Sequence, residues 1–587
     1  MGTRMATTPR PARRSPPTAS GSPARRGRRR ALSTRLGPLV AAAVVAFVAG
    51  AAVGAGGEDP RSKAAREFAD AWARSDYADM HALLTPAARQ RVSLERFAES
   101  YRRAARVATL SSVTAGRPAD PRDGAVAVPV VLRTRIFGTL SGQVQLPVVE
   151  VGDRAAIEWR PYLVHPGMRR GETLTRSTTM PPRAAIQARD GTPLAEGEAR
   201  LSDLGALASE IAGRVGPAPP ERAAELARRG VPPGAPVGLT GLEREFDVEL
   251  SGRPGGELRG GDRVLASVAP RPGSAVRTTI DPGIQRAAVE ALAGRFGGIA
   301  VIRPNDGEVL ALAGVAYSAP QPPGSVFKIV TLAGALEAGV AKPRSKYPVQ
   351  TSAMLEGVEL ENANGESCGG TLRNAFAHSC NSVFAPMGAE LGAERLVAAA
   401  ERFGFNKDPG LAGAMRSTIP AAGEIGDDLA VGSTAIGQGK VLATPLAFAG
   451  IAGAIAMDGL LVQPSLRKGA APSRSRATSP AIAKTIGRYM RAVVTIGTGV
   501  GAAIPGVKVA GKTGTAELRD TTNDDPDPAD PNAAPVDDRT DTDAWFAAYA
   551  PARRPRVAVS VLLVGQGAGG ETAAPAARTV LQAALAR

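Results

Sequence analysis

The chain has 587 residues, which at roughly 150 residues per domain leaves room for about three or four domains. Hydrophobic residues make up 44% and charged residues 21%, a composition that excludes wholesale disorder and a polytopic membrane protein. The formal net charge of +16 is concentrated at one end, because residues 1–35 contain ten Arg and no acidic residue. Without them the chain has 61 basic and 55 acidic residues, so the charge requires no phosphate-binding face and we expect no nucleic-acid partner.

The cysteine and histidine counts exclude two further classes. Two Cys rule out a disulfide-rich scaffold and a Cys-clustered zinc site, and three scattered His argue against a His-ligated metal. We therefore expect no metal and no other cofactor.

A charge-free apolar run follows the basic tail. Residues 36–55 contain no charged side chain, and 20 residues are about the length of a helix that spans a membrane. By the positive-inside rule the ten arginines stay in the cytoplasm and everything after Gly56 is exported. We expect a disordered cytoplasmic tail (1–35) and a transmembrane anchor (36–56), with a cleaved signal peptide as the alternative because small residues near the end of the run offer cleavage sites.

Two regions come next along the chain. Residues 57–165 first show helical spacing of apolar residues and then β-branched alternation, which predicts a small α+β domain. Residues 166–275 are rich in Gly, Pro and Arg and contain only short periodic pieces, which is typical of a connecting module.

The C-terminal part, residues 276–587, begins with readable secondary structure. Asp281 and Pro282 form the N-cap and first turn of a helix, and residues 299–313 form a hairpin around an Asn-Asp-Gly turn. The segment QPPGSVFKIVTLAGALEAG follows, and after its two prolines it predicts a helix that begins near Ser325 and is apolar on every side.

Lys328 is the only charged residue in the first three turns of this helix, and it shares a face with Ser325. Desolvation lowers the pKa of a buried lysine, and a neutral amine beside a hydroxyl at a helix N-terminus can activate a serine nucleophile. The alternative is a helix-capping serine with a lysine that extends to solvent. Ser465 and Lys468 have the same spacing but lie in a polar loop, and we interpret that copy as chance.

Two further motifs favour the catalytic interpretation. Ser379-Cys380-Asn381 and Lys512-Thr513-Gly514-Thr515 follow Ser325 and Lys328 in the order Ser-x-x-Lys, Ser-x-Asn, Lys-Thr-Gly. With these motifs the chain resembles the class B penicillin-binding proteins, membrane-anchored D,D-transpeptidases of peptidoglycan synthesis. Residues 276–587 carry the resemblance, 57–165 look like the family's NTF2-like domain, and 166–275 look like its linker or dimerisation-like module.

The resemblance implies a role for each motif residue. Ser325 attacks the penultimate D-Ala of a stem peptide, Lys328 is the base, Ser379 relays a proton, and Asn381 orients Lys328 and the substrate. Lys512 attracts the substrate carboxylate, with Thr513, Gly514 and Thr515 beside it, and the N–H groups of Ser325 and Thr515 form the oxyanion hole. We assign no role to His378, and we assign Trp545 and Phe546 to the core.

The resemblance also implies the fold, the activity and the partners. We expect an α/β domain of the penicillin-binding/β-lactamase-like type, with an antiparallel sheet, helices on both faces, a C-terminal helix at 572–586 and an all-helical subdomain. We expect a penicillin-sensitive serine D-Ala-D-Ala transpeptidase/carboxypeptidase that acts on peptidoglycan stem peptides and binds β-lactam antibiotics. No glycosyltransferase segment is evident before residue 276, so the resemblance implies a SEDS-type glycosyltransferase partner. The alternatives are a serine β-lactamase and a β-lactam-binding sensor or scaffold of a division complex.

Two features remain outside the motifs. Cys368 and Cys380 are 12 positions apart in a region that we expect to be exported, where disulfides persist, and we weigh a disulfide against two buried thiols. The segment 520–543 contains nine Asp, and we expect a mobile acidic loop at the rim of the site.

Overall fold

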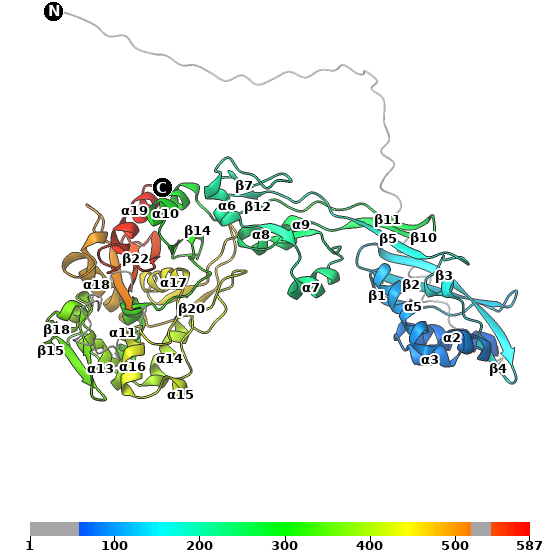
Figure 1. Ribbon diagram of the computed structural model, residues 1–587, viewed down its shortest axis with the longest axis horizontal. Helices are drawn as coiled ribbons and strands as arrows, with labels where there is room; N and C mark the ends of the chain where they lie inside the picture. Colours follow the sequence, from blue (N-terminus) through cyan, green and yellow to red (C-terminus); the bar gives the residue numbers. More distant parts are fainter. Residues whose placement is uncertain (1–57, 518–541) are drawn as a thin grey trace, which may run out of the picture. The chain divides into compact units, whose positions relative to one another are not determined.

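The computed structural model describes residues 58–517 and 542–587 (Figure 1). The predicted tail (1–35), the predicted anchor (36–56) and residues 520–541 of the predicted acidic loop lie outside the described residues. Within the described ranges, no helix combines the length and the apolar character that crossing a membrane requires.

Contacts group the chain into two compact units. The connecting module and the C-terminal domain belong to one unit, while the N-terminal domain is divided between the two. The first unit holds the described residues up to Arg91, Thr114–Val130 and Gln145–Trp159, and the second holds Val92–Val113, Val131–Val144 and Arg160–Arg587.

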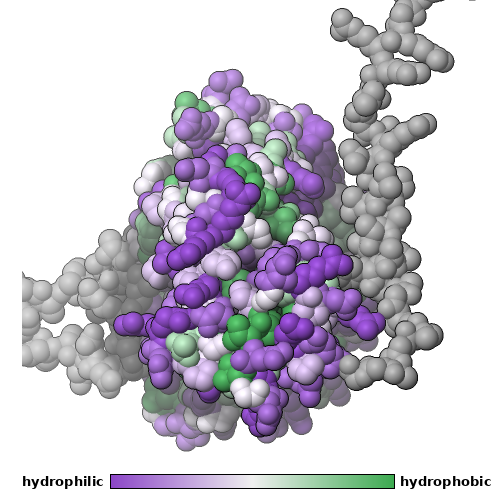
Figure 2. All heavy atoms as spheres, turned by 90° about the vertical axis from the view of Figure 1, so that its right-hand side faces the viewer, coloured by the Kyte–Doolittle hydropathy of each residue, from purple (hydrophilic) through white to green (hydrophobic). Residues whose placement is uncertain are grey.

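The N-terminal domain contains helices and one antiparallel sheet, as the sequence predicts. Alternation in the second strand buries Val126, Val128 and Val130, which is the pattern of a strand with one face on a core. Figure 2 shows a largely hydrophilic face on which apolar areas are small. The elements are α2 (Pro60–Ala73), α3 (Tyr77–Ala82), α4 (Pro86–Arg91), α5 (Leu94–Val107) and the sheet β1 (Leu110–Ala115), β2 (Ala125–Thr134), β3 (Gly138–Val151), β4 (Arg154–Ile157), in that order.

The connecting module is built from short strands and short helices, which agrees with its short periodic pieces. One sheet has the order β11-β10-β5, a second has the order β12-β6-β7, and β8 pairs with β9. The strands are β5 (Leu174–Thr179), β6 (Ile186–Gln187), β7 (Pro193–Ala195), β8 (Val215–Pro217), β9 (Pro236–Gly238), β10 (Gly255–Gly260), β11 (Arg263–Val268) and β12 (Val276–Arg277). The helices are α6 (Ala206–Ala212), α7 (Ala223–Arg228), α8 (Gly241–Glu245) and α9 (Asp247–Ser251).

A five-stranded antiparallel sheet forms the centre of the C-terminal domain. Its order is β14-β13-β23-β22-β21, so the predicted hairpin joins three C-terminal strands and β21 is an edge strand. The strands are β13 (Gly297–Ile302), β14 (Val309–Gly314), β21 (Ala510–Glu517), β22 (Thr542–Ala550) and β23 (Val557–Leu563).

Helices cover both faces of this sheet, which confirms the predicted layers. On one face Ile299 and Val301 pack in a core with α10 (Pro282–Leu292) and α19 (Ala573–Leu585). On the other face Ala300 and Ile302 join the larger core with α11 (Lys328–Ala338) and α17 (Pro445–Ala456). Successive residues of a strand point to opposite faces of the sheet. A strand such as β13 that is buried on both faces therefore has apolar residues at successive positions.

The subdomain beyond α11 is not all-helical, which corrects the prediction. It contains β15 (Lys346–Gln350) paired with β18 (Cys368–Thr371), and β16 (Ser352–Leu355) paired with β17 (Val358–Glu361). The Glu356-Gly357 turn adopts positive φ at both residues, which favours a tight hairpin over a helix.

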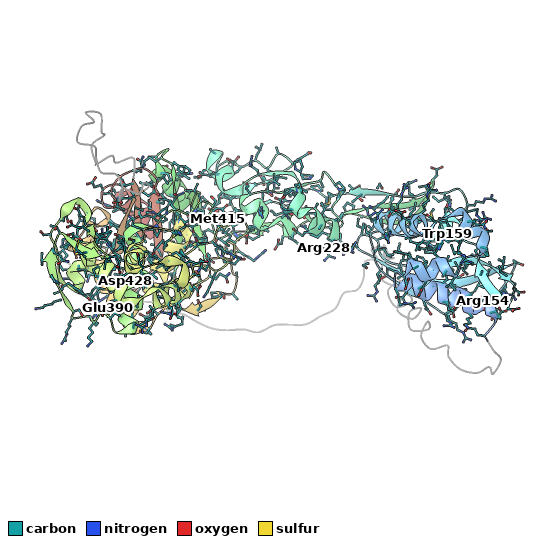
Figure 3. All side chains as sticks on the ribbon, turned by 60° about the horizontal axis from the view of Figure 1, so that its bottom comes forward. Arg154, Trp159, Arg228, Glu390, Met415 and Asp428 are labelled. Atoms are coloured by element: carbon teal, nitrogen blue, oxygen red, sulfur yellow. A yellow bond between two sulfur atoms is a disulfide. The ribbon has the colours of Figure 1, made fainter. Side chains whose placement is uncertain are left out.

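The remaining helices of the domain pack around these strands. Figure 3 labels Glu390 on α13 and Asp428 on α16. These two helices pack closely, because a Cβ on Gly388 of α13 would lie 2.1 Å from the Cβ of Ala435 of α16. The helices are α12 (Leu372–Ala377), α13 (Asn381–Leu391), α14 (Ala393–Arg402), α15 (Ala422–Ile425), α16 (Asp428–Ala435) and α18 (Pro480–Ile496), and a last strand pair is β19 (Leu460–Val462) with β20 (Arg474–Arg476).

A buried carboxylate holds the connecting module together. Asp247 is only 2% exposed and accepts hydrogen bonds from the Gly238 N–H (2.8 Å), Arg183 (2.8 Å), Arg222 (3.0 Å) and Arg229 (3.2 Å). Burial alone raises the pKa of Asp247, but the hydrogen bonds from Gly238 and Arg183 outweigh it and hold the pKa below its ordinary value.

Glu243 of α8, four residues before Asp247, extends this network. Its carboxylate is 1% exposed and accepts hydrogen bonds from Arg183 (2.5 Å) and Arg200 (2.7 Å). Arg183 therefore bridges both carboxylates, and the sequence pattern gave no sign of this network because its members are up to 64 positions apart.

We predict that Asp247→Asn destabilises the connecting module by about 3 kcal/mol, because the variant leaves buried guanidinium groups without their counter-charge. Hydrogen exchange of peptides that span residues 236–251 should accelerate by about 100-fold. Glu225→Gln is the matched control, since its half-exposed side chain pairs with Arg222 and Arg229 at 3.3 and 3.6 Å and is worth less than about 1 kcal/mol. Equal exchange in the two variants would contradict this assignment.

Candidate active site

The turn that carries Ser325 lies directly on strand β21. It is a 3₁₀ turn, η3 (Gly324–Phe327), so the helix predicted to begin near Ser325 starts with one tighter turn and continues as α11. Gly324 has a φ of 52°, and a Cβ on it would lie 2.3 Å from the Thr515 oxygen. A Cβ on Gly514 would lie 2.7 Å from the Pro323 oxygen, so glycine on both sides permits this close approach.

Two neighbouring groups fix the position of this turn. The indole N–H of Trp545 donates a hydrogen bond of 2.9 Å to the Pro322 oxygen. Gly437 approaches from the other side, where the Gly324 N–H donates to the Gly437 oxygen at 3.0 Å. Trp545 and Phe546 are both fully buried, which confirms that they belong to the core.

Lys328, the first residue of α11, is fully buried among oxygen atoms. Its Nζ donates to the Asn381 Oδ1 at 2.6 Å, to the Ser379 main-chain oxygen at 2.7 Å and to the Ser379 Oγ at 3.3 Å. The Ser325 hydroxyl is half-buried and is not among these acceptors. The structure thus brings the first two motifs together through Lys328.

A second buried lysine meets the same serine. Lys512 Nζ donates to the Ser379 Oγ at 2.8 Å and to the Thr513 main-chain oxygen at 3.0 Å. Each amine also lies over an aromatic ring, Lys328 5.6 Å from the centre of Phe384 and Lys512 5.7 Å from that of Phe376. The Ser379 hydroxyl therefore lies between the two amines.

Both lysines have lowered pKa values for related physical reasons. Burial lowers the pKa of Lys512 to about 7. Burial and, after it, the charge of Lys512 lower the pKa of Lys328 well below the ordinary lysine value. Both amines therefore lose their protons more readily than an exposed lysine does.

The Ser379-Cys380-Asn381 motif occupies the junction between two helices. Ser379 follows α12 with a φ of 61°, an uncommon conformation for a residue other than glycine, and Cys380 is the N-cap of α13. Asn381 donates from its Nδ2 to the Glu361 oxygen at 2.8 Å, so its Oδ1 faces Lys328. Cys380 is joined to Cys368 of β18 by a disulfide with a Cα–Cα distance of 5.4 Å.

The Lys-Thr-Gly motif presents its residues on two faces of β21. Lys512 lies on the face of the larger core, while Thr513 and Thr515 lie on the opposite face by strand alternation. The Thr513 and Thr498 hydroxyls are 2.5 Å apart, and Thr515 Oγ1 accepts a 3.4 Å hydrogen bond from the Gly569 N–H.

Sequence reasoning missed the residues that support the motifs. Thr498 contacts Thr513, Glu361 at the end of β17 contacts Asn381, and Gly437 contacts the residue before Ser325. All three are distant from their partners in sequence, and no spacing signal connects them to Ser325. Gly569 fits the same description, and a Cβ on it would lie 2.2 Å from the Gly514 oxygen.

The second Ser-x-x-Lys sequence has a different environment. Lys468 Nζ donates to the Arg189 oxygen at 2.9 Å, and the Ser465 hydroxyl bonds to the main chain of Arg467. Within residues 58–517 and 542–587, no group of three or more His, Cys, Asp or Glu side chains is arranged to hold a metal ion.

Three protein families match separate parts of the chain. Residues 297–582 match the penicillin binding protein transpeptidase domain, and residues 61–172 match the NTF2-like N-terminal transpeptidase domain. Residues 193–269 match the penicillin-binding protein dimerisation domain.

Individual relatives agree with these matches. The peptidoglycan D,D-transpeptidase PbpA of Mycolicibacterium smegmatis is 33% identical over 416 residues, covering 59% of this chain and 79% of the relative. PbpA of Mycobacterium tuberculosis is 34% identical over 418 residues with the same coverage.

Solved structures are similar as well. The penicillin G acyl-enzyme complex of M. tuberculosis penicillin-binding protein A matches with a TM-score of 0.55 and 27% identity, covering 69% of this chain and 99% of that one. Pseudomonas aeruginosa PBP2 in complex with WCK 5153 matches with a TM-score of 0.58 and 25% identity, covering 70% and 96%. This chain therefore belongs to the penicillin-binding proteins, as a class B member with an NTF2-like N-terminal domain.

Proposed function

We propose that this protein is a penicillin-sensitive serine D-alanyl-D-alanine transpeptidase that cross-links peptidoglycan stem peptides through an acyl-enzyme on Ser325. The observation that carries the proposal is the buried Lys328 amine, one helical turn from Ser325 and hydrogen-bonded to both Ser379 and Asn381. Relatives named peptidoglycan D,D-transpeptidase and a relative solved as a penicillin G acyl-enzyme support it.

Acylation uses the neutral form of Lys328. The two N–H groups of the neutral amine are directed to the Asn381 and Ser379 oxygens, which are acceptors only, so the lone pair remains available to take a proton. Ser325 Oγ attacks the carbonyl carbon of the penultimate D-Ala while its proton passes to Lys328. The N–H groups of Ser325 and Thr515 stabilise the negative charge that develops on the carbonyl oxygen.

Loss of the terminal D-Ala requires a proton on its amine. The Ser379 hydroxyl supplies that proton and recovers one from Lys328, because its oxygen lies within 3.3 Å of the Lys328 amine. Protonated Lys512 donates to the same oxygen and supplies positive potential for the substrate carboxylate. An acceptor amine then attacks the ester carbonyl, gives up its proton to Lys328 and restores the Ser325 hydroxyl.

The sequence supports a membrane location for the enzyme, and the family resemblance supports a partner in the membrane. The arginine-rich tail and the apolar run support a single-pass anchor at residues 36–56, with a cytoplasmic N-terminus and the catalytic domain outside the membrane. The transpeptidase forms cross-links and does not polymerise glycan, so a SEDS-type glycosyltransferase in the same membrane supplies the glycan strands.

We predict that Ser325→Ala abolishes labelling by a fluorescent penicillin, because the Ser325 hydroxyl is the group that forms the acyl-enzyme ester in the proposed mechanism. Ser465→Ala is the matched control and should label like the wild type, because Ser465 lies in a loop whose lysine bonds to Arg189. Mass mapping of the labelled wild type should find the adduct on the peptide that contains Ser325. Labelling retained by Ser325→Ala would falsify the assignment.

We predict a bell-shaped pH profile for the second-order rate constant of penicillin acylation. Its rising limb reports deprotonation of Lys328, well below the ordinary lysine value, and its falling limb near pH 7 reports loss of the Lys512 charge. Lys512→Arg should move the falling limb out of the measurable range, because a guanidinium stays charged. Lys328→Arg should be inactive, and a wild-type rate that rises only near pH 10 would contradict the mechanism.

We predict that loss of the disulfide slows acylation without abolishing it. The bond closes a short loop next to Ser379 and Asn381 and constrains the unfolded chain by about 3 kcal/mol, so its removal loosens the junction that holds both residues. Stopped-flow acylation of Cys368→Ser and of the reduced wild type should show the same several-fold decrease. An unchanged rate in the variant would show that the bond serves stability alone.

A further inference from the structure

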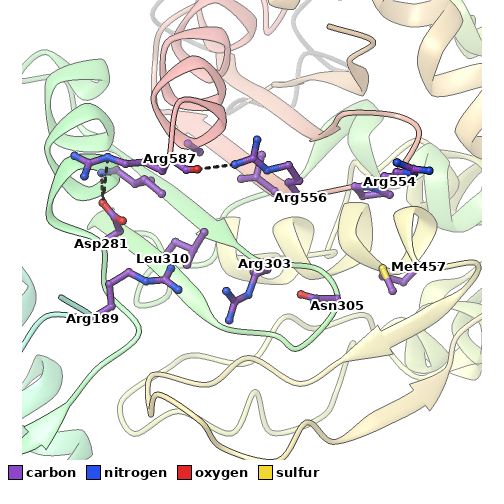
Figure 4. Close-up of a pocket in the computed structure, with 13 residues that line it drawn as sticks. Arg189, Asp281, Arg303, Asn305, Leu310, Met457, Arg554, Arg556 and Arg587 are labelled. Carbon is purple, nitrogen blue, oxygen red and sulfur yellow. Dashed lines mark hydrogen bonds and ion pairs between the residues drawn. The ribbon is translucent and has the colours of Figure 1, made fainter. Parts of the chain in front are cut away.

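A basic cavity lies at the turn between β22 and β23, away from the motif residues. Its volume is about 630 Å³, within the range of about 300–1,000 Å³ that is typical of small-molecule sites. Asp281 is the single acidic residue in its lining. Figure 4 shows the five arginines that line it, Arg189 from the connecting module, Arg303 from the β13–β14 turn, Arg554 and Arg556 from the β22–β23 turn, and Arg587.

Part of this charge is compensated and part is not. Arg303 pairs with Asp306 at 2.8 Å, and both Arg303 and Arg189 contact Glu308. Arg587 lies 3.9 Å from Asp281.

Arg554 has no carboxylate partner in the described parts of the chain. Arg556 donates to the main-chain oxygens of Leu585 (3.1 Å) and Arg587 (2.8 Å), and Arg554 is exposed. The Arg554 guanidinium on this turn is therefore left to face the cavity without a counter-charge.

A second basic cavity, of about 300 Å³, borders the same turn. Asp458 is the single acidic residue in its lining, and it lies 3.9 Å from Lys484. The other cations that line it are Arg488, Arg491, Lys508 and Arg553, and none of them pairs with a carboxylate among the residues that the structure describes.

Two side chains of the smaller cavity have polar atoms available for a ligand. Arg491 has a buried Nη1 without a hydrogen-bond partner, which is costly for a charged donor unless an acceptor is supplied. Burial raises the pKa of Tyr549 to about 12, so its hydroxyl stays protonated and can donate a hydrogen bond. A Cβ on Gly487 would lie 2.6 Å from this hydroxyl, so glycine at this position leaves room for it.

We propose that the two cavities form one binding site for a ligand that carries several phosphate groups. Planar guanidinium groups match phosphate oxygens with paired hydrogen bonds, and the excess of cations in both cavities favours a multiply charged anion over a single carboxylate. Arg553 and Arg554 are adjacent in sequence but line different cavities, so one oligophosphate engages both by crossing the turn.

This site is independent of acyl transfer. The residues that line the two cavities do not include Ser325, Lys328, Ser379, Asn381 or Lys512. The phosphate-binding site therefore adds to the proposed transpeptidase activity and does not depend on it.

The test compares two double variants of the full chain in neutral detergent. Arg553→Gln with Arg554→Gln removes one exposed guanidinium from each cavity, and Arg395→Gln with Arg416→Gln removes two exposed arginines that line neither. Isothermal titration with inorganic tripolyphosphate should show saturable binding to the wild type. The dissociation constant should rise at least about 10-fold in the first double variant and stay within about 2-fold in the second.

Fluorescent penicillin labelling checks that both double variants are folded, and the labelling rate should be unchanged in both.

A competition experiment distinguishes the sources of phosphate. Dihexanoyl phosphatidylglycerol and dihexanoyl phosphatidylcholine, both below their micellar concentrations, are tested as competitors of tripolyphosphate. Competition by the glycerol lipid alone identifies a lipid head group as the source of phosphate, and competition by neither identifies a soluble or polymeric phosphate. Absence of saturable tripolyphosphate binding, or an equal loss in both double variants, would overturn the proposal.

Discussion

One hydroxyl shared by two buried lysine amines is the constraint on which the catalytic site depends. Ser379 Oγ lies 2.8 Å from Lys512 Nζ and 3.3 Å from Lys328 Nζ. Burial disfavours the charged form of each amine, and the charge of one disfavours the charge of the other. The site therefore favours a single positive charge, and in the proposed mechanism Lys512 carries it. This asymmetry supplies a base and a cationic anchor from two residues of the same type.

Close backbone packing keeps the hydroxyl and the two amines in place. The Ser325 turn can rest on β21 only because Gly324 and Gly514 present no Cβ to the opposing main chain. Ser379 adopts a positive φ between two helices, and the disulfide at Cys380 anchors the next residue to β18. Each of these features restricts a backbone segment. The catalytic side chains are therefore held close to their hydrogen-bonding positions before the substrate binds.

The chain handles buried charge differently in its other parts. In the connecting module, buried carboxylates are surrounded by guanidinium groups, which makes Asp247 a structural anchor. In the catalytic centre, burial lowers the pKa of both lysines, that of Lys512 to about 7. At the β22–β23 turn, arginines outnumber carboxylates and remain available to an anion. Burial and the balance of counter-charges, more than residue type, decide which groups stabilise and which can react or bind.

The sequence by itself determined the parts that follow from local pattern. Local pattern predicted the hairpin at 299–313, the helix after Asp281 and the apolar helix that carries Lys328. Three ordered motifs identified Ser325, Lys328, Ser379, Asn381 and Lys512 before any distance was known. The sequence could not show that Ser379 stands between two amines, because the three motifs are up to 187 positions apart. The sequence analysis attributed the excess positive charge to the N-terminal tail. Folding also brings cations from distant segments together around the β22–β23 turn. Contacts between distant segments depend on strand order and close glycine packing, and only the tertiary structure decides those.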